Sequence, residues 1–486
     1  RLVSCTPSPY DLAIASARTC YSPKAIIPNE VTGGQRQRIG AGIWEAGHHT
    51  PFQHATFVFT IENVSRQLVW SLFHSHPYYN SDQTSQRYNV MDEPKAFVPR
   101  LQPAQKRIYE EAIGASWKAY AKLTEIVKQE NARIVAQLGK VKGQDEKQMA
   151  KEAENKAVEN SRYVLPVSAF TSLYHTVSGV VLKRYQMMAG ECDCPEEARK
   201  VVALMLAEAE KFDSSFKMPV PKLPERKFKQ ANGDDFAKKF DAKLNGMRSR
   251  LVAWDENAEG LVADGIREAV GLDVSDDEAI ALALSPEKNP ELLQTLNSWQ
   301  HSPITRALNL ATYTYRKKIS HTCDSQDQRH RTIPATRPLL SRLHTSKPDV
   351  IEPQVIAKCP EAHKIFVETC KELWEAKNRL VEAGVPAEDA IYALPNAVAL
   401  RFTETGRLID WMHKWRMRTC FNAQQEIYDV SMEELAQAGE KHPRLTKFIG
   451  PPCFFRKGLA KPECPEGPRW CGIEVWRNFP KVRRPF

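Results

Sequence analysis

The segment of residues 75–88 carries several of the groups that bind phosphate in proteins. It places hydroxyl, amide and guanidinium side chains in one short polar stretch that includes Ser85, Gln86 and Arg87. Groups of these types can hold a phosphate or the hydrogen-bonding edge of a nucleobase. The alternative interpretation is a polar turn that contains one structural arginine.

A second segment, residues 326–331, has the sequence Gln-Asp-Gln-Arg-His-Arg. Its two arginines, Arg329 and Arg331, flank His330. Neighbouring permanent cations repel each other and are rarely kept close unless an anion lies beside them. We therefore favour an anionic ligand here over a solvated run of charge.

The elements that must position these residues occur twice along the chain. Residues 1–3 (Arg-Leu-Val) are repeated at 250–252, and residues 162–166 (Arg-Tyr-Val-Leu-Pro) are echoed at 391–395 (Ile-Tyr-Ala-Leu-Pro). Each Leu-Pro motif leads into a helical pattern, so the sequence predicts two copies of one fold.

We expect four parts. The first domain takes in residues 1–217, a Pro- and Lys-rich linker follows over 218–249, the second domain covers 250–440, and a Cys/Pro-rich extension ends the chain at 441–486.

Within each copy the patterns predict an early helix, then strands, then long helices. Residues 55–61 alternate as a strand does, and apolar residues recur at three- and four-residue spacing between Ile113 and Val127. Residues 129–160 are rich in Lys and Glu and predict a mostly exposed helical arm. The expected class is α+β, with an antiparallel or mixed sheet and long helices in each copy.

Composition narrows the classes of function. The 486 residues carry a formal charge of +9, which suits nucleotides but is too small to require a nucleic acid. No run approaches the roughly 20 apolar residues of a membrane span, and the chain begins without a basic-then-apolar leader, so we expect a cytoplasmic protein with no membrane partner. The 11 scattered cysteines are interpreted as mostly reduced thiols.

The C-terminal extension carries a separate signal. Three thiols and an imidazole could form a structural zinc site, with ligands His442, Cys453, Cys464 and Cys471. The spacing contains no Cys-x-x-Cys knuckle, which leaves buried or free thiols as the alternative. The basic end of the chain, residues 481–486, is expected to be a surface tail.

These segments resemble the flavin-dependent thymidylate synthases. Ser85-Gln86-Arg87-Tyr88 and Arg329-His330-Arg331 are similar to the two ends of that family's signature, Arg-His-Arg-x-x-Ser-x-Asn-Glu-x-Ser-x-Arg-Tyr. Residues 47–54 resemble its early Gly-His-x-Thr-Pro-Phe-Glu-His motif. The segments 162–166 and 418–426 resemble its late helix, so the resemblance spans most of both halves.

The resemblance implies a site shared between the two copies. The first copy keeps Ser85, Gln86, Arg87 and Arg162 for substrate, whereas the second keeps Gln326, Arg329 and Arg418. The losses are complementary, because Ala189 replaces the late arginine in the first copy and Ile391 replaces the arginine before Leu-Pro in the second. One composite site is thus expected to survive while its mirror is lost.

The activity that the resemblance implies is reductive methylation of dUMP to dTMP, with methylenetetrahydrofolate and NADPH as co-substrates. Arg329 would be catalytic, because it would stabilise negative charge developing on the pyrimidine. Residues implied to hold FAD are His48, Thr50, Gln53, Gln83, His330, Arg331 and Asn422. The family is homotetrameric, so a duplicated chain would form a homodimer that acts as a pseudo-tetramer.

Some positions depart from the family pattern. Asp82 and Gln83 stand where the family has Asn and Glu, and Ser178 and Arg407 stand where it has an Asn that contacts flavin. Two alternatives therefore stay open. One is a related flavoenzyme acting on another pyrimidine nucleotide, and the other is a non-catalytic nucleotide-binding or assembly protein.

Overall fold

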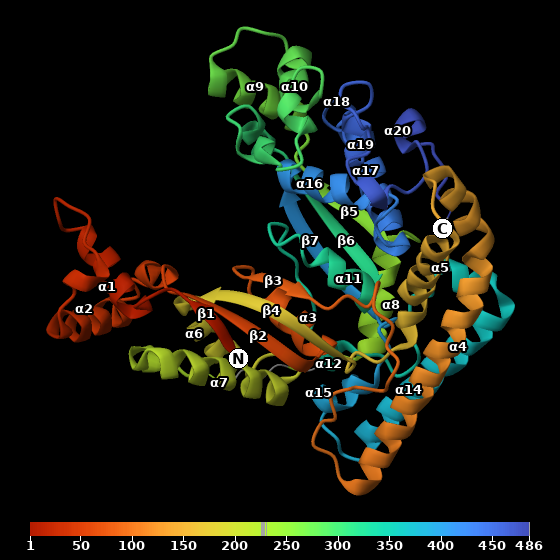
Figure 1. The fold of residues 1–486 in the computed structure, drawn as a ribbon, viewed down its shortest axis with the longest axis horizontal. Coiled ribbons are helices and arrows are strands. Elements are labelled where there is room, and N and C mark those ends of the chain that lie inside the picture. The colour runs from red at the N-terminus through yellow and green to blue at the C-terminus, as the bar shows by residue number, and fades with distance from the viewer. Residues whose placement is uncertain (225–228, 230, 486) are drawn as a thin grey trace.

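The computed structural model describes residues 1–224, 229 and 231–485. The chain forms two α+β halves, as expected, and each half is built on its own sheet (Figure 1). Both sheets are wholly antiparallel, which decides between the antiparallel and mixed sheets that the sequence left open. Part of the expected linker, residues 225–228 and 230, and the last tail residue, 486, lie outside the described residues.

The first half holds a four-stranded sheet in the order β1-β2-β4-β3. Its strands are β1 (Leu2–Cys5), β2 (Thr56–Ser65), β3 (Asn80–Gln83) and β4 (Phe170–Ser178). Its helices are α1 (Pro9–Thr19), α2 (Gly33–Glu45), α3 (Arg66–Ser75), α4 (Pro103–Lys142), α5 (Glu146–Ser161), α6 (Gly179–Met188) and α7 (Pro195–Phe212).

The second half holds a three-stranded sheet in the order β5-β6-β7. Its strands are β5 (Ser249–Trp254), β6 (Thr312–Ser320) and β7 (Ala399–Arg407). Its helices are α9 (Ala258–Val270), α10 (Asp276–Leu284), α11 (His321–Asp327), α12 (Leu340–Leu343), α13 (Gln354–Lys358), α14 (Pro360–Glu382), α15 (Ala387–Ala390), α16 (Leu408–Arg418) and α17 (Gln425–Lys441).

The connecting and terminal segments are also partly helical. Helix α8 (Gly233–Leu244) lies between the halves, and the extension contains α18 (Pro443–Thr446), α19 (Pro452–Phe455) and α20 (Val475–Asn478). Among the described residues, no helix combines the length and apolar composition needed to cross a bilayer. The eleven cysteines are all free thiols, which confirms the interpretation from the sequence.

Several sequence expectations need adjustment. The strand expected at 55–61 is present as β2 and continues to Ser65. The early helix expected in each copy is present as α1 and α9, and a short strand, β1 or β5, precedes it. The arm at 129–160 is helical, formed by the end of α4 and by α5, but it is not mostly exposed. Because α4 and α5 pack against each other, Val135 and Ala157 are buried there.

Matching helix starts show that the halves share one plan. Ser65 and Ser320 end β2 and β6, and their Oγ atoms accept hydrogen bonds from the N–H groups of Leu68 (2.8 Å) and Cys323 (2.9 Å). Each serine therefore caps the next helix, α3 or α11, by satisfying a free N–H of its first turn.

The two Leu-Pro segments pair with each other across the interface between the halves. Pro166 and Pro395 form an antiparallel bridge. Beside it, the N–H of Val167 donates to the oxygen of Leu394 at 2.8 Å, and the N–H of Asn396 donates to the oxygen of Leu165 at 2.7 Å. The repeated motif thus lies on an approximate twofold axis relating the halves.

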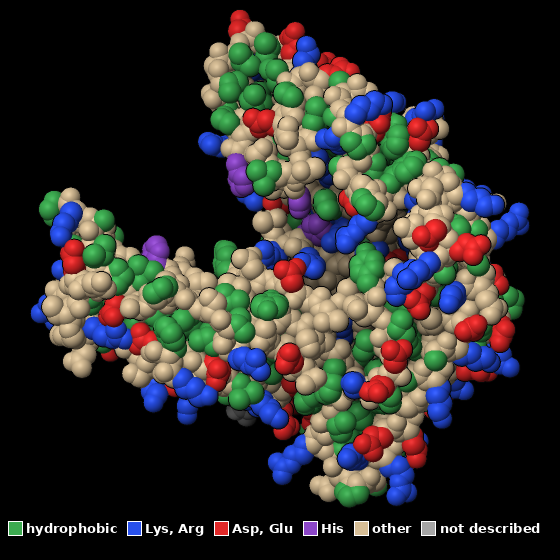
Figure 2. All heavy atoms as spheres, viewed as in Figure 1, with side chains coloured by type: hydrophobic (Ala, Val, Ile, Leu, Met, Phe, Trp, Pro, Cys, Tyr) green, Lys and Arg blue, Asp and Glu red, His purple; other side chains and the backbone are tan. Residues whose placement is uncertain are grey.

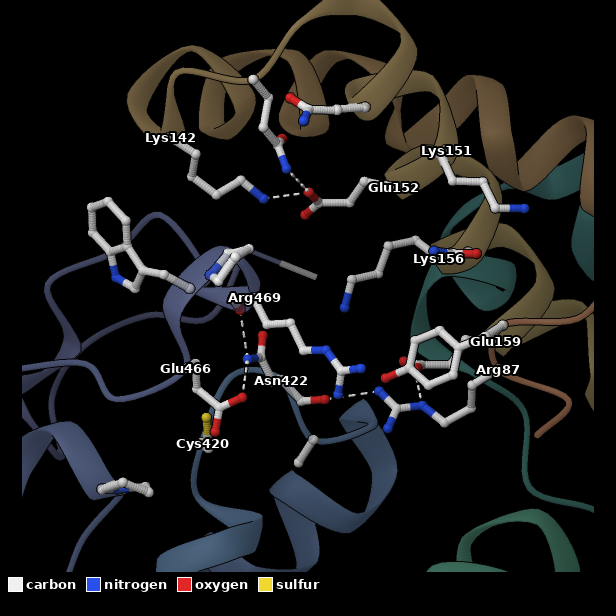
Figure 3. A pocket seen from close by; sticks show the side chains of 18 of the residues that line it. Arg87, Lys142, Lys151, Glu152, Lys156, Glu159, Cys420, Asn422, Glu466 and Arg469 are labelled. Atoms are coloured by element: carbon white, nitrogen blue, oxygen red, sulfur yellow. Dashed lines mark hydrogen bonds and ion pairs between the residues drawn. The ribbon is translucent and has the colours of Figure 1, made fainter. Parts of the chain in front are cut away.

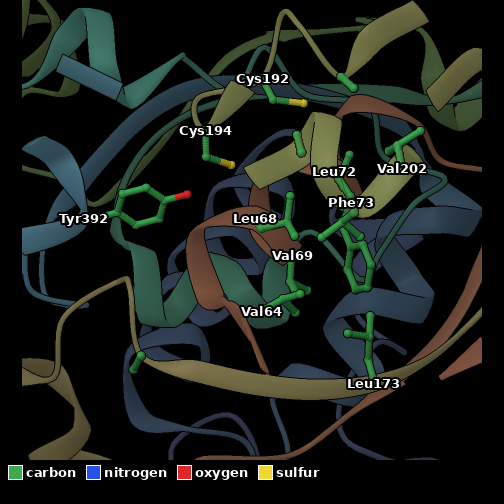
Figure 4. Packing of buried hydrophobic residues seen from close by; sticks show 14 of the residues in the cluster. Val64, Leu68, Val69, Leu72, Phe73, Leu173, Cys192, Cys194, Val202 and Tyr392 are labelled. Atoms are coloured by element: carbon green, nitrogen blue, oxygen red, sulfur yellow. The ribbon is translucent and has the colours of Figure 1, made fainter. Parts of the chain in front are cut away.

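Two buried carboxylates join the halves at this axis. Glu197 accepts from the N–H and Oγ of Ser65 in its own half and from the hydroxyl of Tyr392 in the other. Glu426 accepts in the same way from Ser320 and from Tyr163, the latter at 2.5 Å. Figure 4 shows Tyr392 of the second half beside Cys194 at the edge of the first-half core. The two halves therefore form one interlocked body.

The molecule is hollowed between the lobe of α1 and α2 and the lobe of α9 and α10. Figure 2 shows Lys, Arg and His side chains gathered at the inner corner of this hollow. The long helices α4 and α14 pack against each other on the opposite side of the interface.

The crossing carboxylates generate a stability prediction. Tyr392→Phe leaves Glu197 buried with one donor fewer, so we expect the free energy of unfolding to fall by about 1–3 kcal/mol. Urea denaturation measures this change. Tyr174→Phe, at an exposed tyrosine of β4, is the control and should change stability by less than about 0.5 kcal/mol. Equal effects of the two substitutions would contradict the assignment.

Candidate functional site

Arg87 of the first half contacts the second half directly. It follows β3, its Nε pairs with the carboxylate of Glu159 on α5, and its NH2 donates to the backbone oxygen of Asn422 at 2.8 Å. Burial alone would lower the pKa of Arg87, but the charge of Glu159 outweighs it and raises that pKa. Arg87 is thus a fixed cation at the boundary between the halves.

Glu159 responds to the same environment. Burial alone would raise the pKa of this carboxyl group, but the charges of Arg87, Lys156 and Arg162 outweigh burial and lower the pKa to about 2. A carboxylate ionised at neutral pH holds the Arg87 guanidinium in one orientation.

Arg418 occupies the corresponding place in the second half. It ends α16, where its Nε donates to Nε2 of His330 at 2.9 Å and its NH2 donates to the backbone oxygen of Gln326 at 3.2 Å. Burial and the charges of Arg418 and Lys414 lower the pKa of His330 well below its usual value. The imidazole is therefore neutral and accepts through Nε2.

Arg87 and Arg418 line one pocket of about 620 Å³, together with Asn422. Figure 3 shows Lys142, Lys151, Glu152 and Lys156 of the helical arm facing Arg469 and Asn422 across this pocket. Further lining residues come from the arm and from the extension: Tyr88, Gln144, Gln148, Asn155, Glu159, Met417, Cys420, Ala423, Pro452, Glu466, Pro468 and Trp470. Six cations against three carboxylates make the lining basic, which favours an anion.

Arg162 and Gln326 lie behind this lining rather than in it. Arg162 is buried and donates from Nε to the backbone oxygen of Glu159 at 3.1 Å. Its NH2, and likewise Oε1 of Gln326, has no hydrogen-bond partner within the described part of the chain. Because buried polar groups are usually paired, these two atoms are a free donor and a free acceptor beside the pocket.

Ser85 and Gln86 support the loop instead of lining the pocket. Oγ of Ser85 accepts from the N–H of Arg87 at 3.1 Å, and Gln86 is buried with its Oε1 3.4 Å from Nδ2 of Asn396.

The basic triplet of the second half reaches the polar loop of the first. Arg329 is half-exposed, and its NH2 lies 3.5 Å from the carboxylate of Asp82. Arg331 contacts Asn80 Oδ1 at 3.4 Å and lies over the Tyr79 ring at 4.8 Å. The structure thus brings the two segments singled out from the sequence into contact.

The residues expected to bind flavin do not all lie in one place. Gln53 and Arg331 line a second pocket of about 950 Å³, with Arg184, Ser178 and Arg407. Asn422 lines the first pocket and His330 lies beside it. The remaining three, His48, Thr50 and Gln83, line neither pocket; the first two are exposed.

The predicted zinc site is wrong. His442 is buried elsewhere, where its Nδ1 pairs with the hydroxyl of Tyr313 at 2.8 Å. Within the described ranges, no three His, Cys, Asp or Glu side chains are arranged to hold a metal. The structure agrees with the alternative of buried or free thiols, because Cys453, Cys464 and Cys471 pack as thiols against one apolar core.

The basic end of the chain is also not simply a surface tail. Arg484 donates to the backbone oxygen of Ala423 at 2.6 Å and lies over the Tyr428 ring at 4.9 Å.

Sequence reasoning missed Glu159 and Lys156 in the pocket. The spacing could have revealed Glu159, since it lies near the end of the predicted helical arm, three residues before Arg162. No local pattern marks Lys156, which reaches the pocket only because α5 folds back against α4.

The mirror position is built from different groups. Counted from the first residues of α6 and α16, Asp193 and Asn422 occupy equivalent positions, but Asp193 is fully buried. Asp193 accepts from the N–H groups of Leu340 and Ser341 and from Oγ of Ser341. Ala189 stands at the position of Arg418 on this side.

The fold and site together define a tandem α+β protein with a basic pocket between its halves. Its sequence matches the family described as thymidylate synthase complementing protein over residues 1–213 and 250–444. These segments contain both halves and most of the chain, so the chain belongs to this family. The match confirms the resemblance found in the sequence and fits the tandem arrangement.

Similar proteins correspond to a single copy. The flavin-dependent thymidylate synthase of Clostridium tetani is 28% identical over 216 residues, which is 43% of this chain and 82% of that protein. That of Geobacter sulfurreducens is 28% identical over 242 residues, which is 48% of this chain and 98% of that protein. Among solved structures, the UMP/dUMP methylase PolB from Streptomyces cacaoi bound with 5-Br dUMP covers 44% of this chain and 91% of its own, with 18% identity and a TM-score of 0.34.

The pKa of Glu159 predicts a pH dependence. The unfolded carboxyl titrates near pH 4.5 and the folded one near 2, so its ion pair stabilises the fold above pH 4.5 and loses that effect as pH falls toward 2. Its contribution is at most about 3 kcal/mol. Measured by urea unfolding, the free energy of unfolding of Glu159→Gln should fall less steeply over this pH range than that of the unmodified protein.

Glu154→Gln, on the same helix, is the control for that experiment. It should leave the slope of the free energy of unfolding against pH unchanged. Identical slopes for Glu159→Gln and the unmodified protein would argue against the Arg87–Glu159 pair.

Proposed function

We propose that this protein is an FAD-dependent enzyme that methylates dUMP reductively to dTMP at one site built from both halves. The observation that carries this proposal is the pocket that Arg87 of the first half shares with Arg418 and Asn422 of the second. Membership of the family and the names of its relatives supply the reaction class.

The nucleotide monophosphate is recognised by charge. Its phosphate carries nearly two negative charges, and each charge-assisted hydrogen bond contributes about 1.5–3 kcal/mol. Arg87 and Arg418 supply these donors from the pocket wall. The free NH2 of Arg162 and the free Oε1 of Gln326 offer a donor and an acceptor for the uracil edge.

Arg329 is the catalytic residue of this proposal. It lies where the second half meets the first-half loop, and its charge opposes the negative charge that develops on the pyrimidine ring during attack at C6. A guanidinium held in place before the reaction needs no reorganisation at that moment.

The second pocket is the proposed flavin site. Its size suits a large cofactor, and Arg184, Arg331 and Arg407 provide the cations that a pyrophosphate requires. When bound, the flavin supplies the hydride, with NADPH as its reductant, and methylenetetrahydrofolate supplies the carbon. Gln53 and Arg331 would hold the cofactor, and His330 orients Arg418 between the two pockets.

A second candidate is a nucleotide-binding or assembly protein without catalysis. It is favoured by the exposed positions of His48 and Thr50, which line neither pocket. Flavin binding separates the two candidates, because only the enzyme needs a bound flavin. We also propose a homodimer, in which four halves imitate a tetramer, and light scattering of a monodisperse monomer would contradict it.

Arginine variants test the nucleotide site. Arg418→Ala should raise the Kd for dUMP about 10- to 100-fold in isothermal titration calorimetry, because one or two charge-assisted bonds are lost. Arg342→Ala is the control, because Arg342 follows Ser341 at the mirror position and does not line the proposed nucleotide pocket. It should leave the Kd for dUMP unchanged. Equal affinities for all three proteins would place the nucleotide elsewhere.

Turnover tests the chemistry. With FAD, NADPH and methylenetetrahydrofolate, we expect tritium release from C5-labelled dUMP, and Arg329→Ala should slow it about 10²- to 10³-fold. A protein that binds dUMP but neither binds flavin nor releases tritium would support the second candidate.

A further inference from the structure

A group of buried charges lies beneath the second-half part of the site. It contains two lysines and three carboxylates, each from a different element, and every side chain is at most 2% exposed. We call it the ionic cluster; its members are Lys317 of β6, Asp327 of α11, Glu404 of β7, Lys414 of α16 and Glu434 of α17.

The ionic cluster is closely knit. Nζ of Lys317 lies 3.3 Å from Asp327 and 2.5 Å from both Glu404 and Glu434. Nζ of Lys414 lies 2.5 Å from Asp327 and 2.7 Å from Glu404. Lys414 also lies 3.7 Å from Glu434, so each of the three carboxylates pairs with both lysines.

The first half fills the same place with neutral side chains. His175 and Glu404 are each the sixth residue of β4 and β7, and Tyr185 and Lys414 are each the seventh residue of α6 and α16. Where the second half has an ion pair, the first half has a hydrogen bond of 3.1 Å between His175 and Tyr185.

The other three members of the ionic cluster have apolar counterparts in the first half. Ile61 pairs with the fourth residue of β4 as Lys317 pairs with the fourth residue of β7. Leu72 follows the capping Ser65 at the spacing by which Asp327 follows Ser320. Met205, like Glu434, lies eight residues after the crossing glutamate of its half, and both Leu72 and Met205 are buried.

Stability alone does not explain this replacement. Removing a charge from water costs several kcal/mol, and exchanging buried ion pairs for apolar groups of similar volume is often neutral or stabilising. The first half packs the same framework without such charges. The ionic cluster therefore has a use that apolar packing does not provide, and directional bonds that fix one geometry are such a use.

The ionic cluster is connected to the nucleotide site through Asp327. The backbone oxygen of Asp327 accepts from the N–H of His330 at 3.0 Å, and His330 in turn accepts from Arg418. Lys414 precedes Arg418 by four residues, so one face of α16 presents both side chains. Lys414 holds Asp327, and Arg418 holds Gln326 and His330.

We propose that the ionic cluster is a positioning device for the nucleotide site, which clamps residues 326–331 against α16 so that Arg418 and Arg329 keep their orientation. This inference rests on the proposed function of those arginines. The proposal explains why only the second half has the ionic cluster. The first half has Ala189 in place of Arg418 and lacks the basic triplet, so it has no such arginines to position.

A neutral graft tests the proposal. The graft variant replaces the ionic cluster by its first-half counterparts: Lys317→Ile, Asp327→Leu, Glu404→His, Lys414→Tyr and Glu434→Met. Asp327→Asn is the milder variant, which keeps the shape and removes one charge. Tyr185→Phe is the matched control, because it perturbs the equivalent pair in the first half.

Two measurements are made on the full chain. We expect hydrogen–deuterium exchange of residues 326–331 to rise at least about 10-fold in the graft and to rise less in Asp327→Asn, while residues 72–77 stay unchanged. The Kd for dUMP should rise about 10-fold or more in the graft, although its urea midpoint stays near that of the unmodified protein. Tyr185→Phe should change neither measurement.

The outcomes separate the two ideas. If exchange at 326–331 is unchanged in both cluster variants, the positioning proposal is wrong even when dUMP binds. If the unmodified protein and Arg418→Ala bind dUMP equally, the proposed function is wrong, and exchange at 326–331 still decides the role of the ionic cluster. A loss of dUMP binding accompanied by equal loosening throughout the chain would assign the ionic cluster to stability and also overturn the proposal.

Discussion

The structure depends on two buried carboxylates, Glu197 and Glu426, that each take hydrogen bonds from both halves. Each accepts from a serine of its own half and from a tyrosine on the Leu-Pro segment of the other. A buried carboxylate that loses a donor is strongly destabilised, so neither half can place this glutamate without the other. This crossing makes the duplicated chain one unit and sets Arg87 against Asn422.

The approximate twofold axis relates two places between the halves, and the proposed nucleotide site occupies only one of them. On the retained side, Arg87 lies close both to the buried Arg162 and to the partly buried Arg418, although like charges repel. On the other side, Ile391 and Ala189 stand in place of two of these arginines, and the buried Asp193 accepts from the N–H groups of Leu340 and Ser341. Losing the cations is favourable where no anion compensates them. Keeping them on the retained side is consistent with an anionic ligand there.

Two segments of the retained side, a helical arm that is longer than its counterpart and the C-terminal extension, line the pocket. Helices α4 and α5 extend as an arm over the pocket, whereas α14 of the second half is followed by the short α15. The extension adds Glu466 and Arg469 to the lining. Enclosure lowers the local dielectric and strengthens each interaction between the arginines and an anion. The ionic cluster acts from beneath, where water cannot screen it.

Much of this arrangement can be read from the sequence. The repeat of the Leu-Pro motif predicts two copies, the alternation at 55–61 predicts β2, and the complementary losses of arginine predict a site shared between the halves. These features are local patterns, or differences between the halves that are visible in the sequence. Neither kind depends on how the elements pack in three dimensions.

Other features were decided only by the tertiary structure. His442 has a side chain of a type that binds zinc, but in the fold its Nδ1 pairs with the hydroxyl of Tyr313, because hydrogen-bond partners depend on which elements pack together. Lys156 and Glu159 face the pocket only because α5 folds back on α4. The charges of the ionic cluster are scattered from 317 to 434 in the sequence, and no pattern predicts that they meet. The sequence by itself determined the two copies and the chemical groups that each retained, since these follow from residue identity and short-range order. The tertiary structure alone decided which groups are neighbours, because the energies of burial and charge depend on distances between residues far apart in the chain.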